Sequence, residues 1–204
     1  NVLHDTSTPH RPETNGIAEA AVKRTKEGTS CNIVQSNMHE FWWSDAMQTY
    51  VFLRNVVDIL TTGQTAWKMR FGTDFDGPIL PFGCAIEYVA VSPKDLDRIP
   101  KIGAKTLYGL FLGYKQQAGG GWSGDLRFID KEELCNAEHP EDIYARTQKA
   151  DEVWAIDPKG SKVDLSSRNF YFPLAEGDWN QPWQHEIPKR IRKKRKVATR
   201  KGQP

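Results

Sequence analysis

The first pattern along the chain is a run of apolar residues at the spacing of an α-helix. Ile17, Ala21 and Val22 can share one face, and the pattern predicts a helix over residues 17–34 that packs this face on a core. Asn15 precedes the run and is a favourable N-cap residue. The chain therefore enters its first predicted helix directly after Asn15.

A second helical pattern follows after a short break. Asn37 with Glu40 three residues later has the spacing of a capping box, which predicts a helix start at this point. The apolar residues beyond it recur at helical spacing and predict a strongly apolar face. The members of this face are Trp43, Ala46 or Met47, Tyr50, Leu53 and Val57.

The period of the pattern changes in the middle of the chain. A short helix is predicted around residues 65–70, and three β-rich runs then follow at residues 84–91, 107–114 and 122–129. The triple glycine at residues 119–121 is not followed by the Gly-Lys-Ser/Thr of a phosphate-binding loop, so we interpret it as a turn. Three short strands within some fifty residues favour a small barrel over a βαβ unit.

Composition narrows the class of protein. The chain has 204 residues, of which 38% are hydrophobic, and it contains no apolar run of the roughly 20 residues needed to span a bilayer. Its three cysteines are far apart and form no CxxC pair, so the sequence suggests neither a zinc site nor a disulfide framework. We therefore expect an intracellular protein without a membrane segment.

The charge is distributed unevenly. Residues 188–204 hold nine cations and no acid, whereas residues 1–187 hold 19 cations and 26 acids, a net charge of −7. A block of like charge cannot pack, so we expect a disordered basic tail. Its densest part is a candidate nuclear localisation signal or phosphate-contacting arm, and a solvated linker is the alternative. This part consists of Lys193, Lys194, Arg195 and Lys196.

Charged residues of the first predicted helix carry the candidate chemistry. Glu19, Lys23 and Lys26 stand at positions i, i+4 and i+7, which places them on one stripe of a helix. A carboxylate aligned with cations suits a site that holds a metal ion against a nucleic-acid phosphate. A solvated helix start with an i,i+4 ion pair is the alternative interpretation of the same spacing.

Five motifs in order resemble the integrase region of Copia-type retrotransposon Pol polyproteins. TPHRPETNGIAE, residues 8–19, resembles the family's TPxxPQxNGxAE segment. The others are EFWWSDAM at 40–47, TAWKMRFG at 65–72, FGC at 82–84 and GLFLGY at 109–114, which resemble FWxEA, TPYExxFG, FGC and GIFxGY. The series spans roughly residues 4–130.

The resemblance implies an α+β fold in four parts. Residues 1–72 would be the C-terminal, helical part of an RNase H-like integrase core, and residues 79–132 a small SH3-like β-barrel. We expect a loosely ordered extension over residues 133–187 and the disordered basic tail over residues 188–204.

The resemblance also implies an activity, which is DNA integration by polynucleotide strand transfer. Glu19 would be the third acid of an Asp, Asp, Glu triad that binds Mg²⁺ or Mn²⁺. The partner aspartates should lie upstream, because within residues 1–18 Asp5 is the only candidate and it belongs to the segment that leads to the motif. We therefore expect an integrase fragment that is inactive alone.

The basic side chains of the same helix are the expected DNA contacts. Lys23 and Lys26 match lysines that related integrases use to hold the DNA end, and Arg24 and Asn15 complete the predicted set. The family usually has Arg directly after the glutamate, and Ala20 stands there instead. The expected partners are element ends and target DNA, with a homo-oligomer in the complete enzyme, in the nucleus and cytoplasm.

Two other hypotheses stay open from sequence. The chain is alternatively a non-catalytic module that binds nucleic acid or protein, from a decayed or host-adopted element. It is otherwise an unrelated α+β domain with a fortuitous motif.

Overall fold

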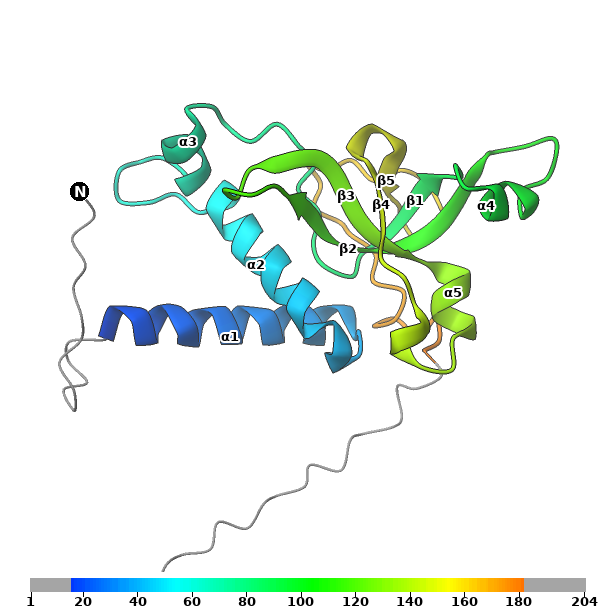
Figure 1. The fold of residues 1–204 in the computed structure, drawn as a ribbon, viewed down its shortest axis with the longest axis horizontal. Helices are drawn as coiled ribbons and strands as arrows, with labels where there is room; N and C mark the ends of the chain where they lie inside the picture. The colour runs from blue at the N-terminus through cyan, green and yellow to red at the C-terminus, as the bar shows by residue number, and fades with distance from the viewer. Residues whose placement is uncertain (1–15, 182–204) are drawn as a thin grey trace, which may run out of the picture.

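The structure is a computed structural model that describes residues 16–181, and it is a mixed α+β fold (Figure 1). None of the helices in this range is long and apolar enough to cross a membrane. The α-helices are α1 (Gly16–Ser36), α2 (Trp43–Val57), α3 (Ala66–Phe71), α4 (Pro93–Asp97) and α5 (Lys131–Asn136). The strands are β1 (Ala85–Val89), β2 (Thr106–Gln116), β3 (Trp122–Asp130), β4 (Arg146–Lys149) and β5 (Val153–Ala155). Short 3₁₀ turns are η2 (Glu40–Trp42), η3 (Pro140–Asp142) and η4 (Ala150–Glu152).

The junction between α1 and α2 differs from the capping box that the sequence predicted. Asn37 has a φ of 52°, a left-handed conformation that ends α1 instead of starting α2. The cap of the following turn is His39, whose Nδ1 accepts a hydrogen bond from the backbone N–H of Phe41 at 3.1 Å. The prediction failed because Asn suits both roles and the sequence alone does not distinguish them.

The buried face of α2 is offset by one residue from the predicted one. Trp43 and Val57 are exposed, and Trp42 and Val56 are buried in their place. The reason is Thr49, a polar residue that is buried because its hydroxyl donates to the backbone carbonyl of Leu112 at 2.6 Å. A prediction that follows apolar residues alone does not find this face, because a polar residue lies at its centre. The complete buried set of α2 is Ala46, Thr49, Phe52 and Val56.

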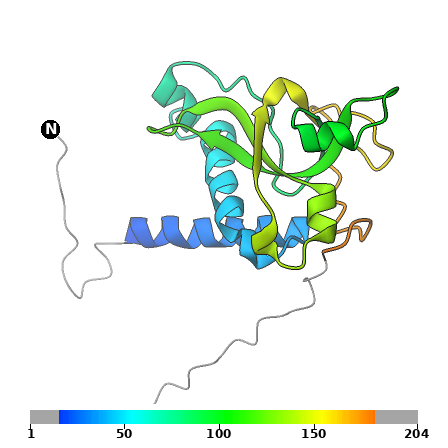
Figure 2. The ribbon, with the colours of Figure 1, turned by 45° about the vertical axis from the view of Figure 1, so that its right-hand side comes forward.

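The five strands form one antiparallel sheet in the order β4-β3-β2-β1-β5. The two edge strands, β4 and β5, follow each other in the chain and are joined only by η4. The Cα atoms of Lys149 and Val153 are therefore at most about 15 Å apart, whereas the edges of a flat five-stranded sheet lie about 19 Å apart. The sheet must curl toward closure, and its curvature is visible in Figure 2.

Two hydrophobic clusters join α2 to the sheet, and the larger contains Phe52 and Val56 of the helix. Phe52 stacks on the ring of Tyr114 with centroids 4.2 Å apart, and Phe111 of β2 packs against the same tyrosine. Gly113 permits the close approach, because a Cβ at this residue would lie 2.3 Å from Thr49 Oγ1. The helical and β-rich parts of the chain thus share buried side chains.

The predicted loosely ordered extension does not describe residues 133–181. This segment supplies most of α5 and both edge strands of the sheet, and it buries Ile143, Tyr171 and Leu174. Gln181 is fully buried, and its side chain donates to the Asn37 carbonyl at 3.0 Å. The polar composition misled the prediction, because β4 (Arg-Thr-Gln-Lys) is held by backbone pairing to β3 and not by apolar side chains.

Candidate functional site

Glu19 lies in the first turn of α1, on a part of the helix that projects past α2 (Figure 1). Every residue from Gly16 to Arg24 is exposed. The buried residues of α1 begin only at Gly28, which is nine positions or about 13 Å further along the axis. Glu19 is therefore open to solvent.

The predicted apolar face of this half-helix is not buried. Ile17 is 91% exposed and Val22 53% exposed, and Ala21 is exposed as well. Among residues 16–181, α2 packs on the second half of α1 and leaves the first half uncovered. The helix itself was predicted correctly, but the expectation of a covered face was wrong for the described part of the chain.

The structure brings three of the predicted site residues together. Glu19, Lys23 and Lys26 line one shallow hollow on the surface of α1, together with Ala18, Val22 and Glu27. Lys23 forms an ion pair with Glu27 at 3.9 Å, but both side chains are well exposed, so this pair contributes little stability. A phosphate group can therefore compete for Lys23 at small cost.

Arg24 does not belong to this group. It lies five residues after Glu19, and at 100° per residue its side chain leaves the helix about 140° away from the glutamate. The other predicted positions, Asn15 and Lys193, Lys194, Arg195 and Lys196, lie outside the described residues, as does Asp5.

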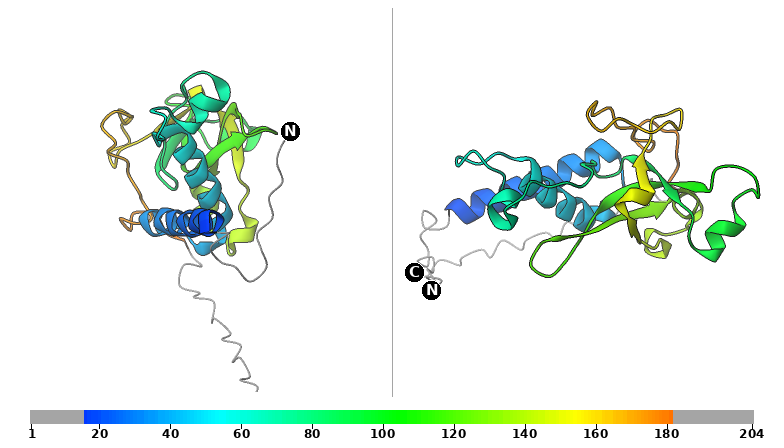
Figure 3. Two further views of the ribbon diagram at one scale, coloured as in Figure 1. Left: turned by 90° about the vertical axis from the view of Figure 1, so that its left-hand side faces the viewer. Right: turned by 90° about the horizontal axis from the view of Figure 1, so that it is seen from above.

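The second half of α1 fixes the direction in which Glu19 projects. A Cβ at Gly28 would lie 2.0 Å from Cζ of Tyr50, so the Tyr50 ring of α2 packs directly on α1 at this glycine. Asn32 adds a hydrogen bond from its side-chain N–H to the carbonyl of Ala46 at 3.0 Å. Seen along its axis, α1 lies beside α2 at the edge of the molecule (Figure 3).

Metal binding at Glu19 needs further ligands. Residues 16–181 contain no group of three or more His, Cys, Asp or Glu side chains arranged to hold a metal ion. A single exposed carboxylate is a suitable but incomplete ligand for Mg²⁺, which prefers a few carboxylates together with phosphate oxygens and water. Glu19 fits the role of one ligand among several.

A buried cluster of charged residues at the other end of the sheet was missed from sequence. Asp130 is fully buried and accepts the Tyr88 hydroxyl at 2.6 Å and the N–H groups of Glu132 and Glu133 at the start of α5. Burial and this hydrogen bond raise the pKa of Tyr88 well above its ordinary value. The cluster ties β1, β3 and α5 together.

Two arginines complete this cluster. Arg146 donates to Asp95 at 2.7 Å, and it also pairs with Glu133. Arg98 reaches Asp95 and Asp130 at 3.3 and 3.2 Å. Because each charge has a partner of opposite sign, we assign the cluster a structural role. Its members are far apart in the sequence, so no local motif predicts it.

The comparisons with known proteins add no assignment: no protein family, no curated protein and no solved structure matches this chain.

Proposed function

We propose that the chain is part of a retrotransposon integrase of the Copia type, in which Glu19 contributes one metal ligand and the α1 lysines hold DNA. The proposal rests first on the ordered motifs between residues 8 and 114. The observation that carries it structurally is the hollow on α1, where Glu19, Lys23 and Lys26 share one accessible face. A carboxylate between a metal ion and DNA must be exposed in this way before it meets both.

The curled sheet supports the part of the proposal that concerns the SH3-like domain. A sheet whose edges are joined by a three-residue turn is close to a small barrel, the architecture that the β-rich motifs imply. The RNase H-like part of the proposal rests on the sequence motifs and on the two helices that carry them.

The chemistry follows from the charges. Mg²⁺ or Mn²⁺, when bound with the further acids of such a site, would activate the attacking oxygen and stabilise the leaving oxygen of a phosphoryl transfer. Glu19 would supply carboxylate oxygen, and Lys23 and Lys26 would pair with phosphates one and two turns along the helix. Because residues 1–204 would supply one of the three acids, we propose that they bind DNA without joining element DNA to target DNA. The complete enzyme would act as an oligomer, in the nucleus and cytoplasm.

A non-catalytic binding module is the second candidate. It is favoured by the exposed lysines Lys23 and Lys26 of the α1 hollow, whose contact with phosphate needs no metal ion. In that case the lysines of α1 would still contact nucleic acid, but Glu19 would have no metal to hold.

DNA binding by α1 is testable by fluorescence anisotropy of a labelled duplex over a series of salt concentrations. The Lys23→Gln/Lys26→Gln variant should bind more weakly, and the slope of log K against log salt should become shallower by about two, because each phosphate contact contributes about 0.9. The matched control is Lys94→Gln/Lys101→Gln, which removes the same charge at the opposite end of the molecule, near α4. Equal losses in the two variants would show that net charge alone controls binding and would refute the α1 site.

A further inference from the structure

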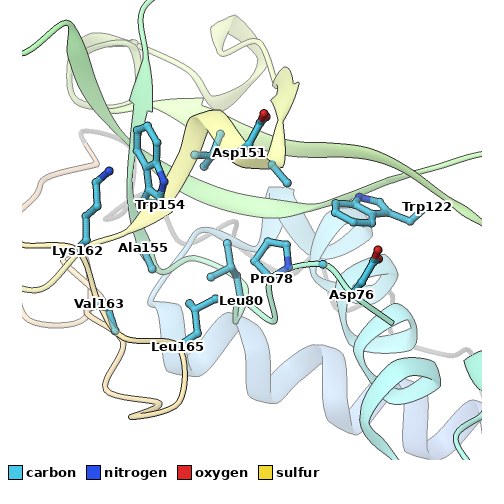
Figure 4. A pocket seen from close by; sticks show the side chains of 13 residues that line it. Asp76, Pro78, Leu80, Trp122, Asp151, Trp154, Ala155, Lys162, Val163 and Leu165 are labelled. Atoms are coloured by element: carbon cyan, nitrogen blue, oxygen red, sulfur yellow. The ribbon is translucent and has the colours of Figure 1, made fainter. Parts of the chain in front are cut away.

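A pocket of about 350 Å³ lies between η4, β5 and the segment that precedes β1 (Figure 4). The indoles of Trp122 and Trp154 stand on opposite sides of it, and Pro78 and Leu80 lie between them. Pockets of this size and apolar character are typical of ligand sites. No residue of the α1 hollow contributes to it, so its role is separate from the proposed DNA contact.

Two carboxylates give the pocket a negative rim. Asp76 and Asp151 line it, are exposed, and form no ion pair within residues 16–181. With Lys162, which also lines the pocket, its charged residues sum to −1 (two carboxylates and one ammonium), and this residual negative charge favours a cationic occupant.

The pocket already holds one cation of its own. Lys162 lines the pocket, and its Nζ lies 3.4 Å from the centre of the Trp154 ring, a cation–π contact. The residue is exposed and forms no ion pair among the described residues, so a stronger cation can displace it. The face of the Trp154 ring is thus a cation-binding surface that Lys162 of the same chain occupies.

The apolar surface continues beyond the pocket. A second hollow shares Gly77 and Leu165 with it and extends along Ile79 to Val57 at the end of α2; its one charged lining residue is Arg168. Ile79, Leu165 and Val57 are each at least 40% exposed. A single small cation would leave this surface uncovered, whereas a peptide with apolar residues beside a basic one would cover both hollows.

We propose that this pocket binds an arginine or lysine side chain of a partner protein, with adjacent apolar residues of the partner in the second hollow. The aliphatic stem of the cation packs on Leu80 and Pro78, and its charged head replaces Lys162 over Trp154, near Asp151. Lys162 competes with the partner's side chain for the Trp154 ring and therefore weakens binding of the partner.

The test uses the full chain and a fluorescein-labelled ten-residue peptide with one central arginine followed by two leucines. Asp151→Asn should weaken binding about three- to fivefold, as expected for one exposed charge pair. Lys162→Gln should strengthen it about two- to fivefold, because the internal cation is removed. The matched controls are Asp97→Asn and Lys159→Gln, exposed residues of the same charge that do not line the pocket. All four positions are exposed, so the fold tolerates the changes.

Three results would overturn the proposal. The first is that Lys162→Gln and Lys159→Gln strengthen peptide binding equally, which would mean that the net charge of the chain alone explains the effect. The second is equal binding of a peptide in which glutamine replaces the arginine, which would make the pocket a plain apolar groove. The third is displacement of the peptide by a short DNA duplex in the Lys23→Gln/Lys26→Gln background, which would assign the pocket to nucleic acid. None of these results bears on the α1 site, because the two surfaces share no residue.

Discussion

Replacement of Gly28 by alanine tests the packing that directs the Glu19 half of α1. In an exposed helix this change stabilises by about 1 kcal/mol, because alanine is the better helix former. Here the new Cβ would lie 2.0, 2.1 and 2.4 Å from three ring carbons of Tyr50, whereas carbon atoms normally approach to about 3.5 Å. Either the ring or the helix must shift by more than 1 Å.

We expect the effect of Gly28→Ala on the free energy of unfolding to have opposite signs in the wild type and in a Tyr50→Ala background. Overpacking of this kind costs about 1–3 kcal/mol, so Gly28→Ala should be destabilising by about 1 kcal/mol net in the wild-type background. In a Tyr50→Ala background the space is open, and the same change should stabilise by about 1 kcal/mol. The coupling between the two positions is then about 2 kcal/mol.

Urea unfolding followed by far-UV circular dichroism measures the four free energies of this cycle. A shift of 1 kcal/mol corresponds to about 2–4 °C in the midpoint of thermal unfolding for a chain of this size. The control is Ala21→Gly on the exposed half of α1, which should cost about 1 kcal/mol in either background. If Gly28→Ala stabilised the wild type as much as the Tyr50→Ala protein, the direct packing of the Tyr50 ring on α1 at Gly28 would be wrong.

Three further predictions concern stability. Thr49→Val should destabilise by about 1–3 kcal/mol in urea unfolding, because the buried Leu112 carbonyl loses its donor, whereas Thr25→Val on an exposed helix face should change little. Arg146→Met should cost about 3 kcal/mol, since it leaves the buried Asp95 with a weaker partner, and a cost under 1 kcal/mol would contradict the cluster. Burial raises the pKa of Asp95, but hydrogen bonds from Arg146 and Ser92 outweigh this effect, so the pKa in the folded protein is lower than the ordinary value. The ionised Asp95 therefore stabilises the folded state above about pH 4, and this stabilisation is lost as the pH falls further. Thermal unfolding between pH 5 and 2 should therefore show a smaller acid loss in Arg146→Met than in the wild type.

The elements that sequence predicted well are those with local signals. The short helix expected at residues 65–70 is α3, which starts after a capping Thr65 and ends at Gly72 with a φ of 80°. The three β-rich runs became β1, β2 and β3, because each is a continuous apolar or alternating segment. The glycines at 119–121 form the turn between β2 and β3.

The features that sequence missed depend on residues far apart in the chain. The buried face of α2 was placed one residue out because Thr49 satisfies its hydroxyl on β2, 63 residues away. The pairing of β4 and the cluster around Asp130 arise from backbone and charge contacts that no periodicity encodes. The pocket between Trp122 and Trp154 likewise forms only when the sheet curls. For the candidate site, the stripe of Glu19, Lys23 and Lys26 followed from helical spacing, whereas the exposure of the whole half-helix required the structure.

The most direct test of the role of Glu19 is the Mg²⁺ dependence of DNA binding at constant ionic strength. A carboxylate beside phosphates repels DNA without metal and attracts it through a shared Mg²⁺. When the further acids of the complete site are present, the wild type and the matched Glu141→Gln variant, at an exposed residue of η3 outside the α1 hollow, should therefore bind DNA more tightly when Mg²⁺ is added. Glu19→Gln should instead bind more tightly without metal and lose the response. An undiminished Mg²⁺ response in Glu19→Gln would contradict the assignment of this residue as a metal ligand.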